Sequence, residues 1–482
     1  MSTHSNTAVN SFAEPNTPEI SKEKLSTRPS VALDPHENPE NLPLIRKWLA
    51  VVVIGSGSLC VTCASSMASF TETGLAKDFH VSHEITILSI SLFVEGLGIG
   101  PLLAGPISEV YGRTIVYRIS YLLLVLFSFP VAFAPNIEVF LIFRFLMGCS
   151  GSSFLSVAGG SVADMFSDAT VANPMALYTI TPFLGPVLAC GVQNLLWRWT
   201  YRILLIWMFF ELVAIFLLVP ESYVPVLLQR KAHSLRKTTG DGSHWAPLDR
   251  RETTLLQSLL MSCYIPFELL FLDKMALLLD LWTALILGIL YLAFQAFPFI
   301  FGNGHHFNMQ MTGLTFLGIG IGMLLGLSSQ PHWNRVFAKA SEKHGGVAPP
   351  ETRLLMGQLG AIIVPISLFW LAFTTYPSVP WIVPILASVP FGAGIFFVFT
   401  STFTYLVTAY RPVAASALAA NSVLRMSFGA VFPLFADAMY DRLGTVGATA
   451  LLAGLTVLVA PLPFIFYRIG PQLRAKSRFA SH

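Results

Sequence analysis

Charged side chains are scarce in this chain. Asp, Glu, Lys and Arg make up 11% of its 482 residues, whereas a typical soluble domain carries about 25%. Hydrophobic residues reach 54%, and long apolar windows recur from Trp48 to Phe466. Such windows are long enough to cross a bilayer as helices. The shortage of charge therefore excludes a soluble globular protein, and a net charge of +3 gives no reason to expect a nucleic-acid partner.

Cysteines are also few, and the five present have no regular framework spacing. Cys60 and Cys63 are one helical turn apart in the first apolar window, which favours packing over a redox or metal role.

His305 and His306 are adjacent, so they would point to different sides of a helix, and a loop is favoured over a metal site. We expect no metal and no cofactor. The chain lacks the G-x-x-x-x-G-K-[ST] phosphate loop, which argues against an ATP-driven pump.

The apolar windows predict an all-α membrane protein with about twelve spanning helices, six on each side of a long polar loop. We place the spans at 48–69, 85–107, 116–134, 137–163, 175–193, 202–219, 275–301, 311–327, 354–375, 381–408, 414–436 and 446–466. They divide the chain into a disordered cytosolic tail (1–47), a first bundle (48–220), a cytosolic linker loop (221–273), a second bundle (274–469) and a cytosolic tail (470–482). The first tail lacks the cationic start and apolar core of a cleavable signal peptide.

Basic residues orient these spans, because Lys and Arg in short loops are retained on the cytosolic side. One side of the predicted arrangement collects Arg46, Lys47, Arg113, Arg230, Lys231, Arg236, Lys237, Arg250, Arg251, Lys274, Arg335, Lys339, Lys343, Arg353, Arg411, Arg474, Lys476 and Arg478. The other side holds little beyond Lys77, Arg198 and Arg442. Both termini and the 221–273 loop are therefore predicted to be cytosolic. The basic stretch of the loop is interpreted as a solvated linker, and contact with lipid headgroups is the alternative.

Small residues recur every four positions in three windows. These ridges are Gly96, Gly100 and Ala104; Gly148, Ser152, Ser156 and Gly160; and Gly318, Gly322 and Gly326. A ridge of small side chains lets a second helix approach closely in a lipid solvent, where no hydrophobic drive brings helices together. The ridges predict a tight bundle.

Several motifs resemble those of the major facilitator superfamily. "GPISEVYGR" carries Gly105, Glu109, Gly112 and Arg113 at the spacing of the family's loop between its second and third helices. "RFLMGCSG" from Arg144 resembles the fourth-helix motif of proton antiporters, although Met147 stands where Gln is usual, and "TPFLGPVLACG" resembles a shortened fifth-helix motif through Gly185 and Pro186. The ordered series is most similar to the fungal drug:proton antiporters with twelve spans.

The resemblance implies a fold of two six-helix transmembrane bundles, related by a pseudo-two-fold axis around a central cavity. It also implies that the "GPISEVYGR" loop latches the outward-facing state. From the residues alone, Glu109 and Arg113 can pair with each other or with a neighbouring helix. A solvated turn that merely ends the helix is the alternative.

Ionisable residues inside the windows are candidates for proton coupling, because a charge near the bilayer centre costs about 2.5–3.5 kcal/mol on insertion scales. We assign this role to Glu95, Arg144, Glu211 and Asp280. Glu95 is the first choice, since its glycine-rich helix would open it to an internal cavity. Arg144 is expected beside Glu95, as a coupling partner or a structural anchor. Structural roles are favoured for Glu211 and Asp280.

Asn421 and Arg425 share a helical face at i, i+4. We predict that they contact substrate, and hydrogen bonding between helices is an equally supported alternative. Phe294 and Phe297 would line an apolar cavity for an amphiphilic substrate, although packed or lipid-facing positions are commoner for such rings.

The motifs together predict a proton-coupled exporter of small amphiphilic organic molecules, such as a drug, toxin or fungal secondary metabolite. Its partners would be the small molecule, protons and the lipid bilayer, and we expect a multi-pass monomer in the plasma membrane. Proton-symport nutrient uptake and a sensor without flux are the alternatives. An enzyme is disfavoured, because the one suggestive acid pair, Asp437 and Asp441, fits an interfacial cap at a helix end.

Overall fold

The computed structural model describes residues 31–166, 170–188, 197–240, 244–250, 255–345, 348–410, 413–475 and 477–480. A smaller compact unit comprises residues 225–252 together with the described residues up to 34. Within it, the Lys231 ammonium lies 2.7 Å from the Asp34 carboxylate. The larger unit, residues 35–224 and 253–482, contains the long apolar helices.

Helices make up nearly all of the described structure, and no β-strand occurs in this part of the chain. An apolar solvent demands this, because every backbone N–H and C=O must find a partner within its own segment. The helices of the first half are α2 (Leu44–Ser66), α3 (Glu72–Phe79), α4 (His83–Ile99), α5 (Pro101–Tyr111), α6 (Arg113–Ala132), α7 (Ile137–Gly151), α8 (Ser153–Ser156), α9 (Ala158–Met165), α10 (Ala172–Leu188) and α11 (Trp197–Leu218).

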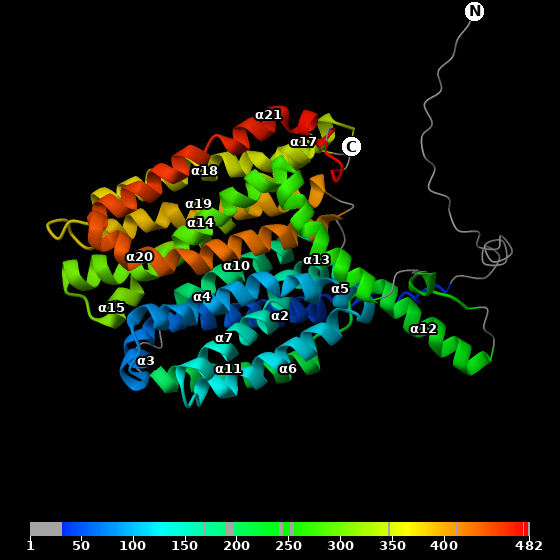
Figure 1. Ribbon diagram of the computed structural model, residues 1–482. Helices are drawn as coiled ribbons and strands as arrows, with labels where there is room; N and C mark the ends of the chain where they lie inside the picture. The colour runs from blue at the N-terminus through cyan, green and yellow to red at the C-terminus, as the bar shows by residue number, and fades with distance from the viewer. Residues whose placement is uncertain are drawn as a thin grey trace, which may run out of the picture. The chain divides into compact units, whose positions relative to one another are not determined.

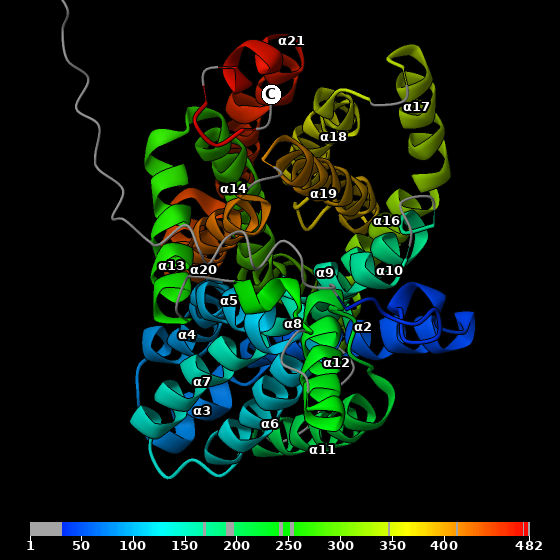
Figure 2. The same ribbon diagram turned by 90° about the vertical axis from the view of Figure 1, so that its right-hand side faces the viewer.

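The remaining helices follow from residue 224 onward. They are α12 (Val224–Thr239), α13 (Leu255–Leu272), α14 (Lys274–Phe297), α15 (Met309–Leu314), α16 (Leu317–Ser328), α17 (Gln330–Lys343), α18 (Leu354–Phe373), α19 (Ile382–Ala409), α20 (Ala414–Val459) and α21 (Leu462–Arg474). Figure 1 shows the long helices of the larger unit running alongside one another. Seen from their ends in Figure 2, α2, α4, α6, α7 and α11 lie on one side, and α14, α18, α19, α20 and α21 lie on the other.

Ten helical stretches in the described residues are long and apolar enough to cross a membrane. The difference from the expected twelve has two causes. The fifth window falls in α10, which has only 17 described residues. The last two windows run together through α20, where Gly444 breaks the helical geometry at φ 68° and ψ 170°. The predicted all-α membrane fold is confirmed.

The described part of the predicted 221–273 linker is largely helical. α12 covers its basic beginning, and α13 packs against α5, α14 and α20 in the larger unit. The hydropathy pattern did not predict α13, because Pro266 and Glu268 interrupt its apolar run. The domain boundaries proposed from the sequence remain a prediction.

The small-residue ridges bring helices into backbone contact, as predicted. A Cβ on Gly148 of α7 would collide with the Phe93 carbonyl of α4, and one on Gly322 of α16 would collide with the Val389 carbonyl of α19. The two halves also touch, because α4 packs along α20 and α10 meets α16. These two contacts place residues of one half directly against the other.

Candidate functional site

Glu95 lies at the contact between the two halves. Its half-buried carboxylate accepts a hydrogen bond from the Ser427 hydroxyl of α20 at 3.1 Å. One turn earlier, the Ser91 hydroxyl donates to the Ala430 carbonyl at 2.6 Å, and Gly98 lies against α20 on the same face. A movement that separates α4 from α20 would therefore change the surroundings of this carboxylate.

Arg144 is fully buried in α7 and faces a different side of α4. Its Nε donates to the Ser89 carbonyl at 2.9 Å and its Nη1 to the Ala64 carbonyl at 3.0 Å. The guanidinium also lies 4.3 Å from the centre of the Phe93 ring. Glu95 follows Phe93 by two residues, about 200° around the helix, so it points towards α20. The expected placement of Arg144 beside Glu95 is thus wrong in this conformation.

Asp280, Asn421 and Arg425, which sequence analysis treated separately, form one cluster between α14 and α20. The Asn421 amide nitrogen donates to the fully buried Asp280 carboxylate at 2.9 Å and to the Thr283 hydroxyl at 2.7 Å. Arg425, one turn beyond Asn421, places its guanidinium 5.1 Å from the centre of the Phe403 ring and acts electrostatically on Asp280. Thr283 was missed, although it follows Asp280 at i+3 on the same helical face.

This cluster retains polar atoms without a hydrogen-bond partner in the described structure. They are one carboxylate oxygen of Asp280, the amide oxygen of Asn421 and Nε of Arg425. Buried polar groups are usually paired, and each exception requires an explanation. The cluster can therefore still accept a proton or bind a polar group inside the second half.

Glu211 belongs to a third environment, inside the first half. Its carboxylate is 7% exposed and accepts a hydrogen bond from the Ser56 hydroxyl of α2 at 2.7 Å. The three predicted carboxylates are therefore dispersed. Glu95 lies between the halves, Glu211 lies within the first and Asp280 lies within the second.

The turn between α5 and α6 is built around Gly112, whose φ is 101°. A side chain is rarely tolerated there, and a Cβ on Gly112 would collide with the Glu221 carboxylate. Glu221 also accepts a hydrogen bond from the Arg113 backbone N–H at 2.9 Å. The turn is thus closed by an acid that lies beyond the end of α11.

Arg113 pairs across the bundle with Asp164 of α9, where Nε lies 3.3 Å from the carboxylate. It also donates to the Ser108 hydroxyl at 2.7 Å. Pairing with a neighbouring helix was one of the two predicted arrangements. Asp164 and Glu221 were not predicted, because they lie 51 and 108 residues from Arg113 in the chain. Glu109 is half-buried in the last turn of α5, and Gly105 has open space where a Cβ would stand.

Gly185 brings α10 against α2. A Cβ there would collide with the Thr62 side chain, and the Gly185 carbonyl accepts a hydrogen bond from the Cys63 thiol at 2.9 Å. The motif residue is therefore required for close helix packing. The side chain of Pro186 lies outside the described residues.

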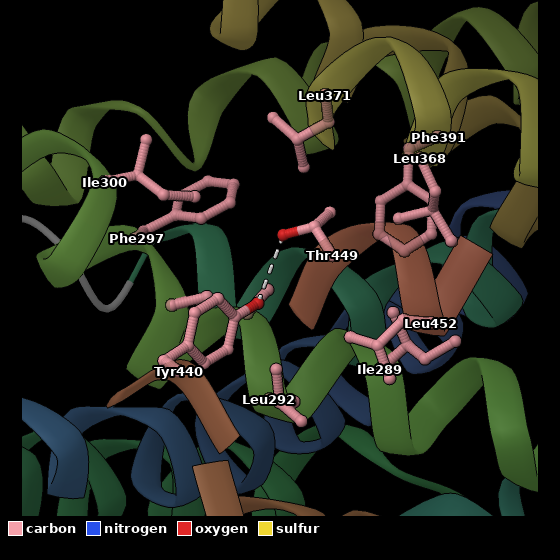
Figure 3. A pocket seen from close by; sticks show the side chains of 12 residues that line it. Ile289, Leu292, Phe297, Ile300, Leu368, Leu371, Phe391, Tyr440, Thr449 and Leu452 are labelled. Carbon is pink, nitrogen blue, oxygen red and sulfur yellow. Dashed lines mark hydrogen bonds between the residues drawn. The ribbon is translucent and has the colours of Figure 1, made fainter. Parts of the chain in front are cut away.

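Phe297 lines an apolar cavity inside the second half, together with residues of α14, α18, α19 and α20 (Figure 3). In Figure 3 the Tyr440 hydroxyl points across this space to Thr449, 3.4 Å away. The cavity volume is about 20 Å³, which is room for about one water molecule. A drug-sized molecule does not fit there in this conformation. The side chain of Phe294 lies outside the described residues.

A family model described as "Major Facilitator Superfamily" matches residues 54–433. The chain belongs to the major facilitator superfamily. Membership in this superfamily makes it a multi-pass membrane transporter and not an enzyme, and the resemblance noted in the sequence is confirmed.

Curated superfamily members align over most of the chain. The chain is 48% identical over 395 residues to "Efflux pump atB" of Aspergillus terreus, covering 80% of this chain and 83% of that one. It is 39% identical over 453 residues to "Probable drug/proton antiporter YHK8" of Saccharomyces cerevisiae, covering 93% and 88% of the two chains.

Solved structures support the superfamily fold. The proton:xylose symporter XylE superimposes with a TM-score of 0.63 at 15% identity, covering 88% of this chain and 96% of that chain. The human organic anion transporter MFSD10 superimposes with a TM-score of 0.59 at 16% identity, covering 86% and 99%. At these identities the likeness concerns the fold alone.

Proposed function

We propose that the protein is a proton-driven exporter of small amphiphilic organic molecules in the plasma membrane. Relatives named as an efflux pump and as a probable drug/proton antiporter support this direction of transport. So does a relative of Monascus ruber, 37% identical, that is named as a transporter of a citrinin biosynthesis cluster. The substrate class is thus a drug or a secondary metabolite. A monomer with both termini in the cytosol completes the proposal.

The observation that carries the proposal is the hydrogen bond between Glu95 and Ser427. A carboxylate held between two halves changes its solvation when those halves move, and its protonation then changes the energy of their contact. Glu95 would bind a proton in one conformation and release it in another, which is the link an antiporter requires.

The Asp280 cluster is the second coupling candidate. Asn421 and Arg425 there supply donors for a polar group, and Asp280 has an oxygen free to take a proton. In this scheme Arg144 and Glu211 hold the helices of the first half in register. Roles of Phe294 and Phe297 in substrate contact require a wider space than this conformation has at Phe297.

Flux into proteoliposomes tests the proposal. With purified protein and a panel of amphiphilic fluorescent dyes, an acidic lumen should drive dye accumulation, because protons leaving the vesicle exchange for dye entering it. This direction does not depend on protein orientation, since the gradients alone set it. Accumulation driven by an acidic exterior would instead establish symport, and binding without flux would establish a sensor.

Glu95→Gln keeps the shape of the side chain but cannot ionise. We expect dye binding to persist and pH-driven accumulation to fall to the level of empty vesicles. Glu138→Gln, on an exposed acid at the start of α7, is the matched control and should transport normally. Wild-type accumulation by Glu95→Gln would assign coupling to Asp280 or Glu211 instead.

A further inference from the structure

Four polar side chains from both halves meet at the end of the larger unit where α3 lies, away from the C-terminus in Figure 1. Glu72 of α3 and His83 of α4 come from the first half. Gln295 of α14 and Asp437 of α20 come from the second. We name these residues the outer-seam cluster, because they join the halves on the side predicted to face outwards.

The cluster is a chain of contacts that crosses from one half to the other twice. The Gln295 amide donates to the Glu72 carboxylate at 2.9 Å. His83 Nε2 lies 3.6 Å from the other Glu72 oxygen and 3.1 Å from the Asp437 carboxylate. The His83 ring therefore stands between an acid of each half. When both acids are ionised they repel each other across this ring, whereas a protonated Glu72 carries no charge and removes that repulsion.

We propose that the outer-seam cluster is a proton-binding lock that holds the outer ends of the two halves together when it is protonated and releases them when it loses its protons. The lock is separate from Glu95 and from the Asp280 cluster. It needs no substrate to operate.

The groups of the outer-seam cluster differ in exposure, and the exposed ones can exchange protons with the outer solution. The His83 and Asp437 side chains are 45% and 31% exposed, while Glu72 is 4% exposed. Other ionisable groups also face the cluster. Glu84 of α4 and Asp441 of α20 act on Asp437, and Glu72 acts on the Tyr201 phenol of α11. No lysine or arginine is paired with the cluster in the described residues, and His83 is the basic side chain that lies between its two acids.

Glu72 strengthens the same response. Burial is the main cause that raises the pKa of Glu72, the hydrogen bond from Gln295 lowers it and the charge of Asp437 raises it, and together they bring it to about 8. When the halves separate and water reaches this carboxyl, its pKa returns towards the ordinary value of about 4.3. The closed lock therefore holds its proton more tightly than the open one.

The direction of the pH effect follows from this difference. A group whose pKa is raised in the closed state favours closure at low pH, and that contribution is lost as the pH rises through about 8 for Glu72. Acid outside the cell closes the outer face. The use of this step in an export cycle rests on the proposed function, in which an incoming proton resets the carrier.

Spin-label distances test the lock without substrate or gradient. Lys77→Cys in α3 and Arg442→Cys in α20, both at exposed positions, would carry the labels. The full-length protein, with its native cysteines replaced, would be measured in lipid nanodiscs. Two populations are compared, one with a short distance between the labels and one with a long distance. Between pH 6 and pH 8.5 we expect the ratio of the short-distance to the long-distance population to fall roughly tenfold or more. At pH 6 we expect most molecules to show the short distance.

Variants assign the response to the cluster. Glu72→Gln/His83→Gln removes the buried acid and the ring that lies between the two acids, and should make the distances independent of pH. His80→Asn, on an exposed residue of the same connection with a φ of 53° that Asn tolerates, is the control and should respond as the parent does. If the double variant does not fold, Asp437→Asn is measured in its place. This variant should reduce the change in the two populations between pH 6 and pH 8.5.

Two results would overturn the lock. One is a parent protein whose distances do not change with pH, and the other is an undiminished shift in the double variant or in Asp437→Asn. Neither result depends on transport. A protein that fails to export dye but shows the pH-dependent distances would retain the lock and lose the proposed function.

Discussion

Asn421 is the residue on which the polar centre of the second half depends. One amide nitrogen donates to one oxygen of the Asp280 carboxylate and to the Thr283 hydroxyl, and all three side chains are buried. Buried acceptors that lose their donor bear the full desolvation cost. The side chain thus stabilises the packing of α14 against α20 in addition to any contact with substrate.

Replacing Asn421 by Ala should therefore destabilise the protein by about 1–3 kcal/mol, the cost of leaving a buried polar group unpaired. A lower midpoint of thermal unfolding in detergent, followed by size-exclusion chromatography, would register the loss. Asn334→Ala on the surface helix α17 is the comparison and should leave the midpoint within error. Equal midpoints for the two variants would mean that Asn421 does not support Asp280.

At the scale of elements, the turn from α5 to α6 depends on a glycine and on an acid from a distant segment. Gly112 adopts a positive φ, and the Glu221 carboxylate occupies the space beside it. Arg113 then begins α6 with its side chain directed to Asp164 of α9. The turn therefore ties α5, α6, α9 and the end of α11 together on the side predicted to be cytosolic.

Gly112→Ala should lower both stability and transport, because an alanine at φ 101° and ψ 160° costs about 1–3 kcal/mol and its methyl group displaces Glu221. The unfolding midpoint and dye accumulation would be measured for each variant. Gly105→Ala lies in the same motif, where the structure leaves open space, and should be neutral. Combining Gly112→Ala with Glu221→Ala should restore only part of the loss, since the strained φ remains. A neutral Gly112→Ala would refute the role of the turn.

At the scale of the whole molecule, the proposed transport cycle depends on contacts that join the two halves at different depths. Glu95 bonds to Ser427 within the paired helices α4 and α20, and the outer-seam cluster joins the same two helices, together with α3 and α14, at one end. Both sets of contacts must change when the halves move. Transport and outer closure are thus expected to respond to protons through different groups.

The predicted topology can be checked independently of transport. The excess of basic residues on one side predicts that both termini are cytosolic. An epitope tag at either end should be inaccessible to antibody in intact cells and become accessible after permeabilisation. A tag in the connection between α3 and α4 is the control and should be stained in intact cells. Staining of either terminus without permeabilisation would reverse the arrangement and place the outer-seam cluster in the cytosol.

The sequence by itself determined the membrane class, the positions of most spans and the ridges along which helices pack. These features are local, since hydropathy and the spacing of small residues are properties of single helices. Windows 48–69 and 354–375, for example, correspond to α2 and α18 within a few residues. The motifs also indicated the superfamily, because they carry local turn and packing requirements such as those at Gly112 and Gly185.

Only the tertiary structure decided which polar residues meet. Glu95 and Ser427 are 332 residues apart, and Asp280 and Asn421 are 141 apart. Helical periodicity places each on a face but does not say which helix covers that face, so Arg144 was expected beside Glu95 and instead bonds to backbone carbonyls. No role was predicted for His83 from the sequence, because a single histidine at the start of a helix carries no signal by itself. Its contacts with acids of both halves are visible only in the tertiary structure.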